Sequence, residues 1–168
     1  MAEKRLRVAV DTNVLLDLAN KEEPVIDAVA TIRRRIKPAT IVVTSTVLHE
    51  LANLVDNGET QEIRRSARLA AERLHRAWRF EPIELSPVEN GIVEQIATRL
   101  LDQGLLPREE VHDAFVLGEA ALLNCTILLT SDSHLREIDY RAAALELKAC
   151  DVEMPVIATP REIVSKFF

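Results

Sequence analysis

Short apolar runs alternate along the chain with longer segments in which apolar residues recur every three or four positions. The short runs predict buried strands at residues 6–10, 41–43, 80–85, 126–130 and 155–158. The longer segments predict helices at residues 13–20, 24–37, 45–57, 59–80, 87–104 and 107–123, after residues 131–133, and from residue 160. Because strands alternate with helices throughout, we expect an α/β fold with a parallel sheet covered on both faces.

The helix expected at residues 59–80 has an apolar side and a basic side. Its apolar side holds Ile63, Ala67, Ala70, Leu74 and Ala77. Six arginines and two glutamates give residues 60–80 a charge of +4, and most of the arginines project away from the apolar side. A solvated face is one interpretation, and contact with RNA phosphates is the other. The residues that would bind RNA are Arg64, Arg68 and Arg76.

Length and charge narrow the class of protein. A chain of 168 residues has the size of one domain, and we expect residues 1–168 to form a single domain without a linker. The net charge of -6 argues against a nucleic-acid binder that relies on overall charge, but a local basic face leaves an RNA substrate open. Two cysteines are too few for a disulfide framework, and no apolar run is long enough to span a membrane. We therefore expect a cytoplasmic protein.

Four acidic residues stand where a ligand site of an α/β sheet would form. Asp11 and Asp132 each follow a predicted strand, Asp113 begins an apolar helix, and Glu50 lies within another. Ligands of open α/β sheets bind at the carboxyl ends of the strands, where these acids could converge. Converging carboxylates repel one another unless they bind a proton or a hard cation such as Mg²⁺ or Mn²⁺. Each acid taken alone also fits a structural role, as a helix cap, a turn residue or a solvated side chain.

The order of these acids in their local sequences resembles the PIN-domain ribonucleases. Residues 8–16 (VAVDTNVLL) are similar to the opening motif of that family, and Glu50 within residues 48–51 (LHEL) is placed like its second acid. Residues 113–120 (DAFVLGEA) resemble the third motif, residues 129–135 (LTSDSHL) resemble the fourth, and residues 156–162 resemble the last strand and helix start. No single motif is specific, but the ordered set covers nearly the whole chain.

The resemblance implies both a fold and an activity. It implies a three-layer sandwich with a central parallel sheet of four to five strands and helices on both faces, in which the basic helix at residues 59–80 is an addition to compact members. It also implies a Mg²⁺- or Mn²⁺-dependent endoribonuclease. The acids that would bind the metal and activate water are Asp11, Glu50, Asp113 and Asp132.

Polar residues beside these acids have candidate supporting roles. We expect Asn13 and Thr130 to orient a ligand carboxylate or a water molecule, although capping and turn formation are equally good explanations. We expect His134 to contact the substrate phosphate or a metal ligand, and His49 and His112 to be structural. Zinc is disfavoured because His49 and Glu50, as neighbours on a helix, point about 100° apart.

The resemblance leaves the biological partner open. Small bacterial members of the family are VapC-type toxins that a partner antitoxin holds inactive, while other members process RNA without one. A homodimer is expected only from the resemblance. Two other functions remain: a non-catalytic RNA-binding or scaffold protein of the same fold, and a phosphatase with Asp11 as its nucleophile. The second is weakened because Asn13 stands where a second aspartate would be expected.

Overall fold

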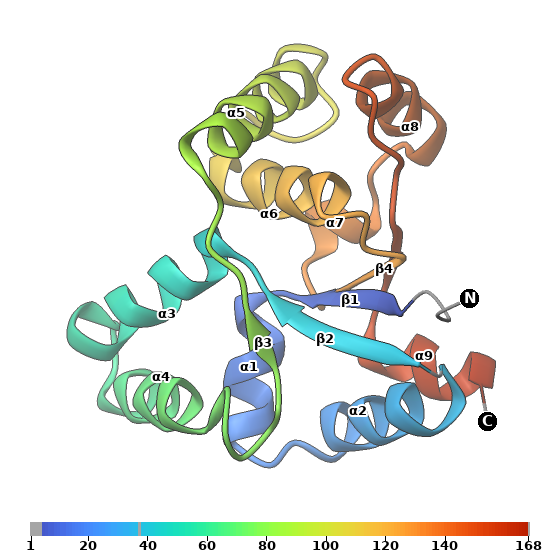
Figure 1. Ribbon diagram of the computed structural model, residues 1–168. Helices are drawn as coiled ribbons and strands as arrows, with labels where there is room; N and C mark the ends of the chain where they lie inside the picture. The colour runs from blue at the N-terminus through green and yellow to red at the C-terminus, as the bar shows by residue number, and fades with distance from the viewer. Residues whose placement is uncertain (1–4, 37, 168) are drawn as a thin grey trace.

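Five parallel strands form one sheet in the order β3-β2-β1-β4-β5 (Figure 1). The computed structural model describes residues 5–36 and 38–167. The strands are β1 (Leu6–Val10), β2 (Ala39–Val43), β3 (Glu81–Pro82), β4 (Ile127–Leu129) and β5 (Val156–Ala158). The predicted α/β class with a parallel central sheet is confirmed.

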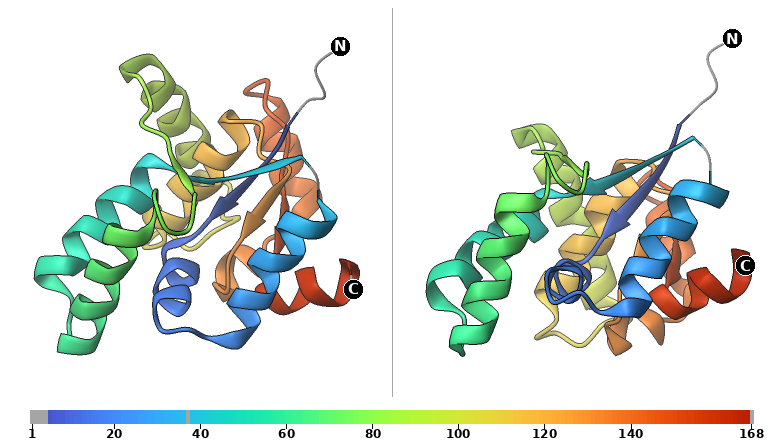
Figure 2. Two further views of the ribbon diagram at one scale, coloured as in Figure 1. Left: turned by 60° about the horizontal axis from the view of Figure 1, so that its bottom comes forward. Right: turned by 90° about the horizontal axis from the view of Figure 1, so that it is seen from below.

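Helices lie on both sides of this sheet and complete three layers, as the views in Figures 1 and 2 show. One layer contains α1 (Thr12–Ala19), α2 (Glu23–Arg35), α4 (Gln61–Arg73) and α9 (Pro160–Phe167). The other contains α5 (Pro87–Asp102), α6 (Val111–Leu122), α7 (Ser133–Arg136) and α8 (Tyr140–Lys148). Helix α3 (Ser45–Asn57) packs against both α4 and α6 at the β3 side of the sheet. Among the described residues, we find no helix with the length and apolar character that a bilayer crossing requires.

The strand interiors and α6 contribute a large part of the core. Val8, Val42 and Leu128 are fully buried in the three central strands, as expected for a sheet whose two faces are both covered by helices. Helix α6 is buried over most of its surface and packs on α5. A Cβ atom on Gly118 would lie 3.3 Å from Val93 and 3.4 Å from Ile96, so glycine permits this close approach. Burial of α6 fixes the direction of its first turn, which carries His112 and Asp113.

The predicted helix at residues 59–80 is too long, since α4 ends at Arg73. Beyond it the chain turns, with Arg79 in a left-handed conformation (φ 57°), and delivers Phe80 to a fully buried position. Arg33 of α2 lies 5.6 Å from the centre of the Phe80 ring and donates a hydrogen bond to the carbonyl of Trp78. Burial of Phe80 therefore outweighs the helical periodicity of the last turns. Arg76 and Arg79 lie outside the helix and do not share a helical face with Arg64.

Other boundaries also differ from the sequence prediction. Residues 107–110 form a turn rather than the start of α6. Strand β3 covers only Glu81–Pro82, at the sheet edge where a proline is tolerated. Helix α8, whose first turn is capped by Asp139, was missed in a stretch that reads as polar. Lys37, the predicted end of the second helix, lies outside the described residues.

Candidate functional site

The register of β1 and β4 brings two predicted site residues to one edge of the sheet. Val10 pairs with Leu129, so Asp11 and Thr130 follow neighbouring parallel strands at their carboxyl ends. The backbone N–H of Asp11 donates to the carbonyl of Leu129 at 3.0 Å. The Thr130 hydroxyl donates to Oδ2 of Asp11 at 2.8 Å. Strand pairing therefore fixes the position of the Asp11 carboxylate.

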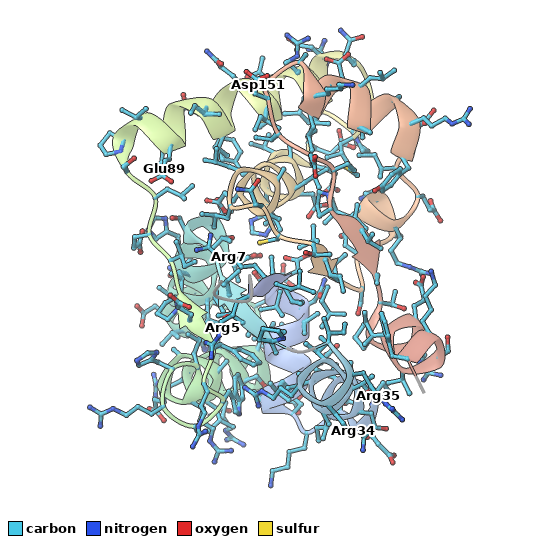
Figure 3. The ribbon with its side chains drawn as sticks, turned by 45° about the vertical axis from the view of Figure 1, so that its right-hand side comes forward. Arg5, Arg7, Arg34, Arg35, Glu89 and Asp151 are labelled. Atoms are coloured by element: carbon cyan, nitrogen blue, oxygen red, sulfur yellow. The ribbon has the colours of Figure 1, made fainter. Side chains whose placement is uncertain are left out.

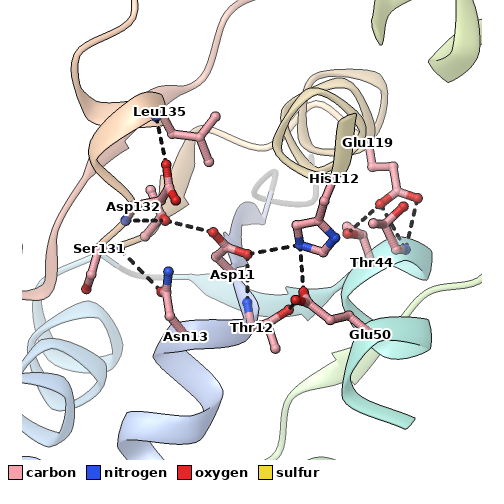
Figure 4. Close-up of polar contacts among 12 residues, drawn as sticks. Asp11, Thr12, Asn13, Thr44, Glu50, His112, Glu119, Ser131, Asp132 and Leu135 are labelled. Carbon is pink, nitrogen blue, oxygen red and sulfur yellow. Dashed lines mark hydrogen bonds and ion pairs between the residues drawn. The ribbon is translucent and has the colours of Figure 1, made fainter. Parts of the chain in front are cut away.

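Asp11 combines a capping role with a place at the centre of the acidic cluster (Figure 4). Its Oδ1 accepts a hydrogen bond of 2.8 Å from the backbone N–H of Thr12 at the start of α1. Only 3% of the residue is exposed. The capping role and the site role were alternatives for this aspartate, and its geometry accommodates both.

Glu50 approaches Asp11 from α3, and His112 of α6 lies between the two carboxylates (Figure 4). The hydroxyl of Thr12 donates a hydrogen bond to Oε2 of Glu50. Nε2 of His112 is 2.6 Å from Oε2 of Glu50 and 3.8 Å from Oδ1 of Asp11. Burial lowers the pKa of His112, but the two carboxylates outweigh it and raise this pKa to about 10. Burial raises the pKa of Glu50, while His112 and Thr12 lower it by more.

His112 was expected to be structural, and its position beside two site acids differs from that expectation. It precedes Asp113 by one position, so on a helix the two side chains point about 100° apart. The first turn of α6 reaches the sheet edge, and His112 faces Asp11 and Glu50 from it. His49, by contrast, is exposed, and its Nε2 lies 3.9 Å from Oε1 of Glu84, away from the site acids.

Asp113 is the acid with the fewest partners. The residue is 4% exposed, and its Oδ2 is buried without a hydrogen-bond partner. Burial, with the charges of Asp132 and Asp11 and a contact with Glu110, raises its pKa to about 8. A buried carboxylate oxygen without a donor is costly unless it binds a proton or a cation. The donor set of carboxylate oxygens around it suits a hard divalent cation.

Asp132 lies next to this acid and caps α7. Its Oδ1 accepts hydrogen bonds from the backbone N–H groups of His134 at 2.8 Å and Leu135 at 3.1 Å. Its own N–H donates to the Thr130 hydroxyl oxygen at 3.0 Å, and that hydroxyl donates to Asp11. Thr130 therefore links the two aspartates that follow β1 and β4.

The remaining predicted neighbours make other contacts. Oδ1 of Asn13 accepts a hydrogen bond of 3.3 Å from the N–H of Ser131, so it binds a loop rather than a site acid. Nδ1 of His134 lies 3.2 Å from Oε1 of Glu110 and 3.9 Å from Oδ1 of Asp132. Glu110 was not predicted, because nothing in its local sequence distinguishes it from Glu109.

The predicted RNA-binding arginines lie on and beyond α4. Arg64 and Arg68 line an open pocket between α3 and α4 together with Val55, Gln61 and Arg65. Arg64 donates to the carbonyl of Gly58, whereas Arg68 and Arg76 are exposed. A second basic group, Arg34 and Arg35, is exposed at the end of α2 (Figure 3).

Glu119 is a buried acid that sequence reasoning missed. It is 1% exposed, and its Oε1 accepts hydrogen bonds of 3.0 Å from the hydroxyl of Thr44 and from the backbone N–H of Thr46. Thr44 does not cap α3 with its own side chain, so the carboxylate of Glu119 satisfies the start of this helix instead. Because α3 carries Glu50, Glu119 joins the two helices that bring Glu50 and His112 together. The sequence signal that could have identified Glu119 is the presence of an acid inside an otherwise apolar stretch of helix.

We expect Glu119→Ala to lower the free energy of unfolding by about 2 kcal/mol, since it leaves buried donors at Thr44 and Thr46 without an acceptor. Glu119→Gln keeps one acceptor oxygen and removes a charge whose burial raises the pKa of Glu119, so its effect should be clearly smaller. Urea unfolding of both variants measures the difference. Equal losses would show that the hydrogen bonds to α3 contribute little.

Known proteins resemble this chain in sequence motif and in fold. A family model described as the PIN domain matches residues 8–140. Among solved structures, VapBC2 of Rickettsia felis, bound to a DNA fragment from its promoter, matches with a TM-score of 0.62 and 17% identity over 92% of this chain and 98% of that chain. DNA-bound VapBC of Salmonella typhimurium gives 0.60 and 16%, again over 92% and 98%. VapBC-5 of Mycobacterium tuberculosis gives 0.54 and 15% over 91% and 96%. At these identities the structures show a shared fold. Comparison with curated protein sequences gives no match.

Proposed function

The chain belongs to the PIN domain family, and from that premise we propose that it is a Mg²⁺- or Mn²⁺-dependent endoribonuclease that hydrolyses phosphodiester bonds in RNA. One observation carries the proposal: a buried Asp113 whose Oδ2 has no hydrogen-bond partner lies among other acids at the carboxyl edge of the sheet. We take residues 1–168 as one domain with this edge as its active site.

Each acid has a defined part in the proposed site. Asp11, Glu50, Asp113 and Asp132 would hold the cation, which when bound lowers the pKa of a water molecule and offsets charge on the phosphate oxygens. Thr130 and the N–H of Thr12 hold the two oxygens of Asp11 in place. The Thr12 hydroxyl orients Glu50. These contacts fix the carboxylates before substrate arrives, as efficient catalysis requires.

The other two candidate functions receive less support. In a purely structural set of acids we would expect every buried carboxylate oxygen to have a donor, and Oδ2 of Asp113 has none. A phosphatase with Asp11 as its nucleophile would be expected to have a second aspartate two residues further, where this chain has Asn13. Asn13, two residues further, contacts Ser131 instead of assisting Asp11.

We also propose a protein antitoxin as a partner and a homodimer as the assembly. The support for the antitoxin is the shared fold with chains from the VapBC complexes of Rickettsia felis and Salmonella typhimurium. The homodimer rests on the family resemblance alone. Co-expression with a small protein encoded beside this chain would test the first, and the mass of the purified chain in solution would test the second.

RNA digestion with and without a chelator tests the proposed activity. The purified chain should cleave RNA in MgCl₂ or MnCl₂, lose cleavage in excess EDTA, and regain it when the metal is added back above the chelator. The reason is that four carboxylates at one edge cannot approach a phosphate without a cation to offset their charge. Cleavage that continues unchanged in EDTA would contradict the proposed metal dependence.

Arginines on α4 and in the turn after it are proposed to bind the RNA backbone. We expect Arg68→Gln with Arg76→Gln to reduce the slope of log affinity against log salt by about 1.4, at about 0.7 per phosphate contact on a single strand. Arg64, the third predicted residue, is kept because it donates to Gly58. The matched control is Arg141→Gln with Lys148→Gln, which removes the same charge from exposed positions of α8. If the two double variants showed the same salt slope, the α4 arginines would be solvated side chains that do not contact RNA.

A further inference from the structure

A basic surface lies at the amino ends of β2 and β3, whereas the site acids Asp11 and Asp132 follow the carboxyl ends of β1 and β4. Two separate parts of the chain form this surface. The last turn of α2, which leads into β2, and the turn that leads into β3 contribute five exposed arginines: Arg33, Arg34, Arg35, Arg76 and Arg79. We call these five residues the amino-edge patch, and Figure 3 shows two of them, Arg34 and Arg35, at the end of α2. The patch therefore lies on the other side of the sheet edge-to-edge from the proposed active site.

Contacts of Arg33 join the two parts of the patch. Its guanidinium donates a hydrogen bond to the carbonyl of Trp78 and lies 5.6 Å from the centre of the Phe80 ring. Phe80 is fully buried and anchors the turn. Arg79 beside it has a left-handed backbone (φ 57°), which is uncommon for a residue other than glycine. The turn is therefore held against α2 in one conformation, with arginines on both sides of the contact.

The positive charges of the patch are not balanced by ion pairs within the part of the chain that the structure describes. There, none of the five arginines contacts a carboxylate, whereas Arg99 and Arg136 each do. Burial, and then the charge of Arg79, lowers the pKa of Arg33, so like charges repel one another here. The macrodipole of α2 accounts for basic residues in its last turn, but not for those that the second turn adds. An anion that contacts several arginines would relieve the repulsion.

Trp78 adds an aromatic surface beside these charges. Its ring lies 5.8 Å from the Phe80 ring at a tilt of 51°, and the residue stays partly exposed. Proteins bind single-stranded nucleic acid with this combination, because bases stack on an aromatic ring while guanidinium groups contact the phosphates. The chemistry of the patch therefore fits a polyanion that also carries bases.

We propose that the amino-edge patch and Trp78 bind an unpaired segment of RNA at a distance from the bond that is cleaved. Stacking on Trp78 requires a base that is not held in a duplex, so this surface selects single-stranded RNA. The five residues of β1, at about 3.3 Å each, separate the two edges by about 16 Å, which about five nucleotides at 3.4 Å each would span. The inference deepens the proposed function and rests on it for the choice of RNA as the ligand, but binding at the patch does not require the metal site.

The fluorescence of Trp78 tests this inference directly, because it is the only tryptophan of the chain. In EDTA, an oligouridine of about twelve nucleotides should quench this fluorescence to a plateau as a base stacks on the indole. An abasic oligomer of the same length and a blunt RNA duplex should change it little. No quenching by oligouridine, or equal quenching by all three ligands, would overturn the proposal.

Arg34→Gln with Arg79→Gln tests the charges of the patch. Both side chains are exposed, so neither replacement removes a core contact. The slope of log affinity against log salt, measured by anisotropy of labelled oligouridine in EDTA, should fall by about 1.4. Arg141→Gln with Lys148→Gln removes the same charge from exposed positions of α8 and should keep the wild-type slope. Equal slopes in the two double variants would contradict a phosphate contact at the patch.

Two replacements of Trp78 separate stacking from packing on Phe80. Trp78→Leu keeps an apolar contact but removes the flat ring, and it should weaken oligouridine binding by about fivefold to a hundredfold, the usual effect of losing one stacked base. Trp78→Phe keeps a ring and should retain most of the affinity. Thermal unfolding of both variants checks that the turn stays folded. Equal affinities of folded Trp78→Leu and wild type would rule out stacking on this residue.

RNA cleavage in MgCl₂ by the same preparations separates this inference from the proposed function. Quenching in EDTA by a chain that cleaves no RNA would uphold the patch and contradict the ribonuclease proposal. Cleavage by a chain whose Trp78 fluorescence does not respond to RNA would uphold the ribonuclease proposal and overturn the patch.

Discussion

Asp11→Asn is expected to lower the rate of RNA cleavage by at least about a hundredfold while the fold stays intact. Replacing residues that only support a metal ligand costs about 10 to 100-fold, so loss of a ligand charge should cost more. The fold should survive because asparagine is as good a helix cap as aspartate, and its amide oxygen can accept from the N–H of Thr12. Its NH₂ group then faces the Thr130 hydroxyl, which can rotate to accept.

Initial cleavage rates of a labelled RNA, measured beside thermal unfolding, provide the comparison. Asp27→Asn is the matched control, since it makes the same change on the exposed side of α2 and should cleave at the wild-type rate. The pair also identifies a contaminating ribonuclease, which would give all three preparations similar activity. A folded Asp11→Asn protein that retains more than a tenth of wild-type activity would remove Asp11 from the proposed site.

The sheet edge was predictable because strand pairing alone brings it together. Asp11 and Asp132 follow apolar runs, and parallel strands place their carboxyl ends side by side. Their capping of α1 and α7 was equally readable, and both roles coexist. Glu50 and Asp113 required the further assumption that α3 and α6 reach the same edge. The fold satisfies it through the packing of α3 on α6.

The acids and histidines that complete the cluster were not predictable by the same reasoning. Glu110 and His112 depend on the direction of the first turn of α6, which is set by burial of the rest of that helix. Glu119 depends on contact with Thr44 and Thr46, more than seventy positions away. The local sequence marks Glu119 as an acid inside a largely apolar helix, but it does not identify the partner, because tertiary packing decides which face of a helix meets which loop.

The end of α4 illustrates the opposite failure, in which a clear local pattern is overruled. The apolar spacing from Ile63 to Leu74 continues to Ala77, yet the helix ends at Arg73. Phe80 is one of the largest fully buried side chains, and burying a residue of that size is worth about 2 to 3 kcal/mol. This gain exceeds the propensity of one more helical turn, so Arg76 leaves the helical face on which it was placed.

Asp113→Asn is expected to stabilise the metal-free protein and at the same time to remove most of its stabilisation by metal. In EDTA, the wild type must bury a carboxyl group whose pKa is raised to about 8 by burial and by neighbouring acids, and whose Oδ2 has no donor. Asparagine has the same shape without the charge, so the free energy of unfolding should rise by about 1 to 3 kcal/mol.

Divalent cation should reverse the order of the two proteins. At a Mn²⁺ concentration about a hundred times the Kd, the wild type gains about 2.7 kcal/mol, which for a chain of this length raises Tm by about 5 to 10 °C. Asp113→Asn lacks one of the four proposed ligands, so its Tm should rise much less, and its RNA cleavage should be lost despite the greater stability in EDTA. Thermal unfolding of both proteins in EDTA and in MnCl₂ measures this reversal in the order of Tm. The control variant Asp27→Asn should have the wild-type Tm under each condition. If Asp113→Asn were less stable than the wild type in EDTA, Asp113 would have to act as a structural acid, and the inference of a cation at its unpaired oxygen would be wrong.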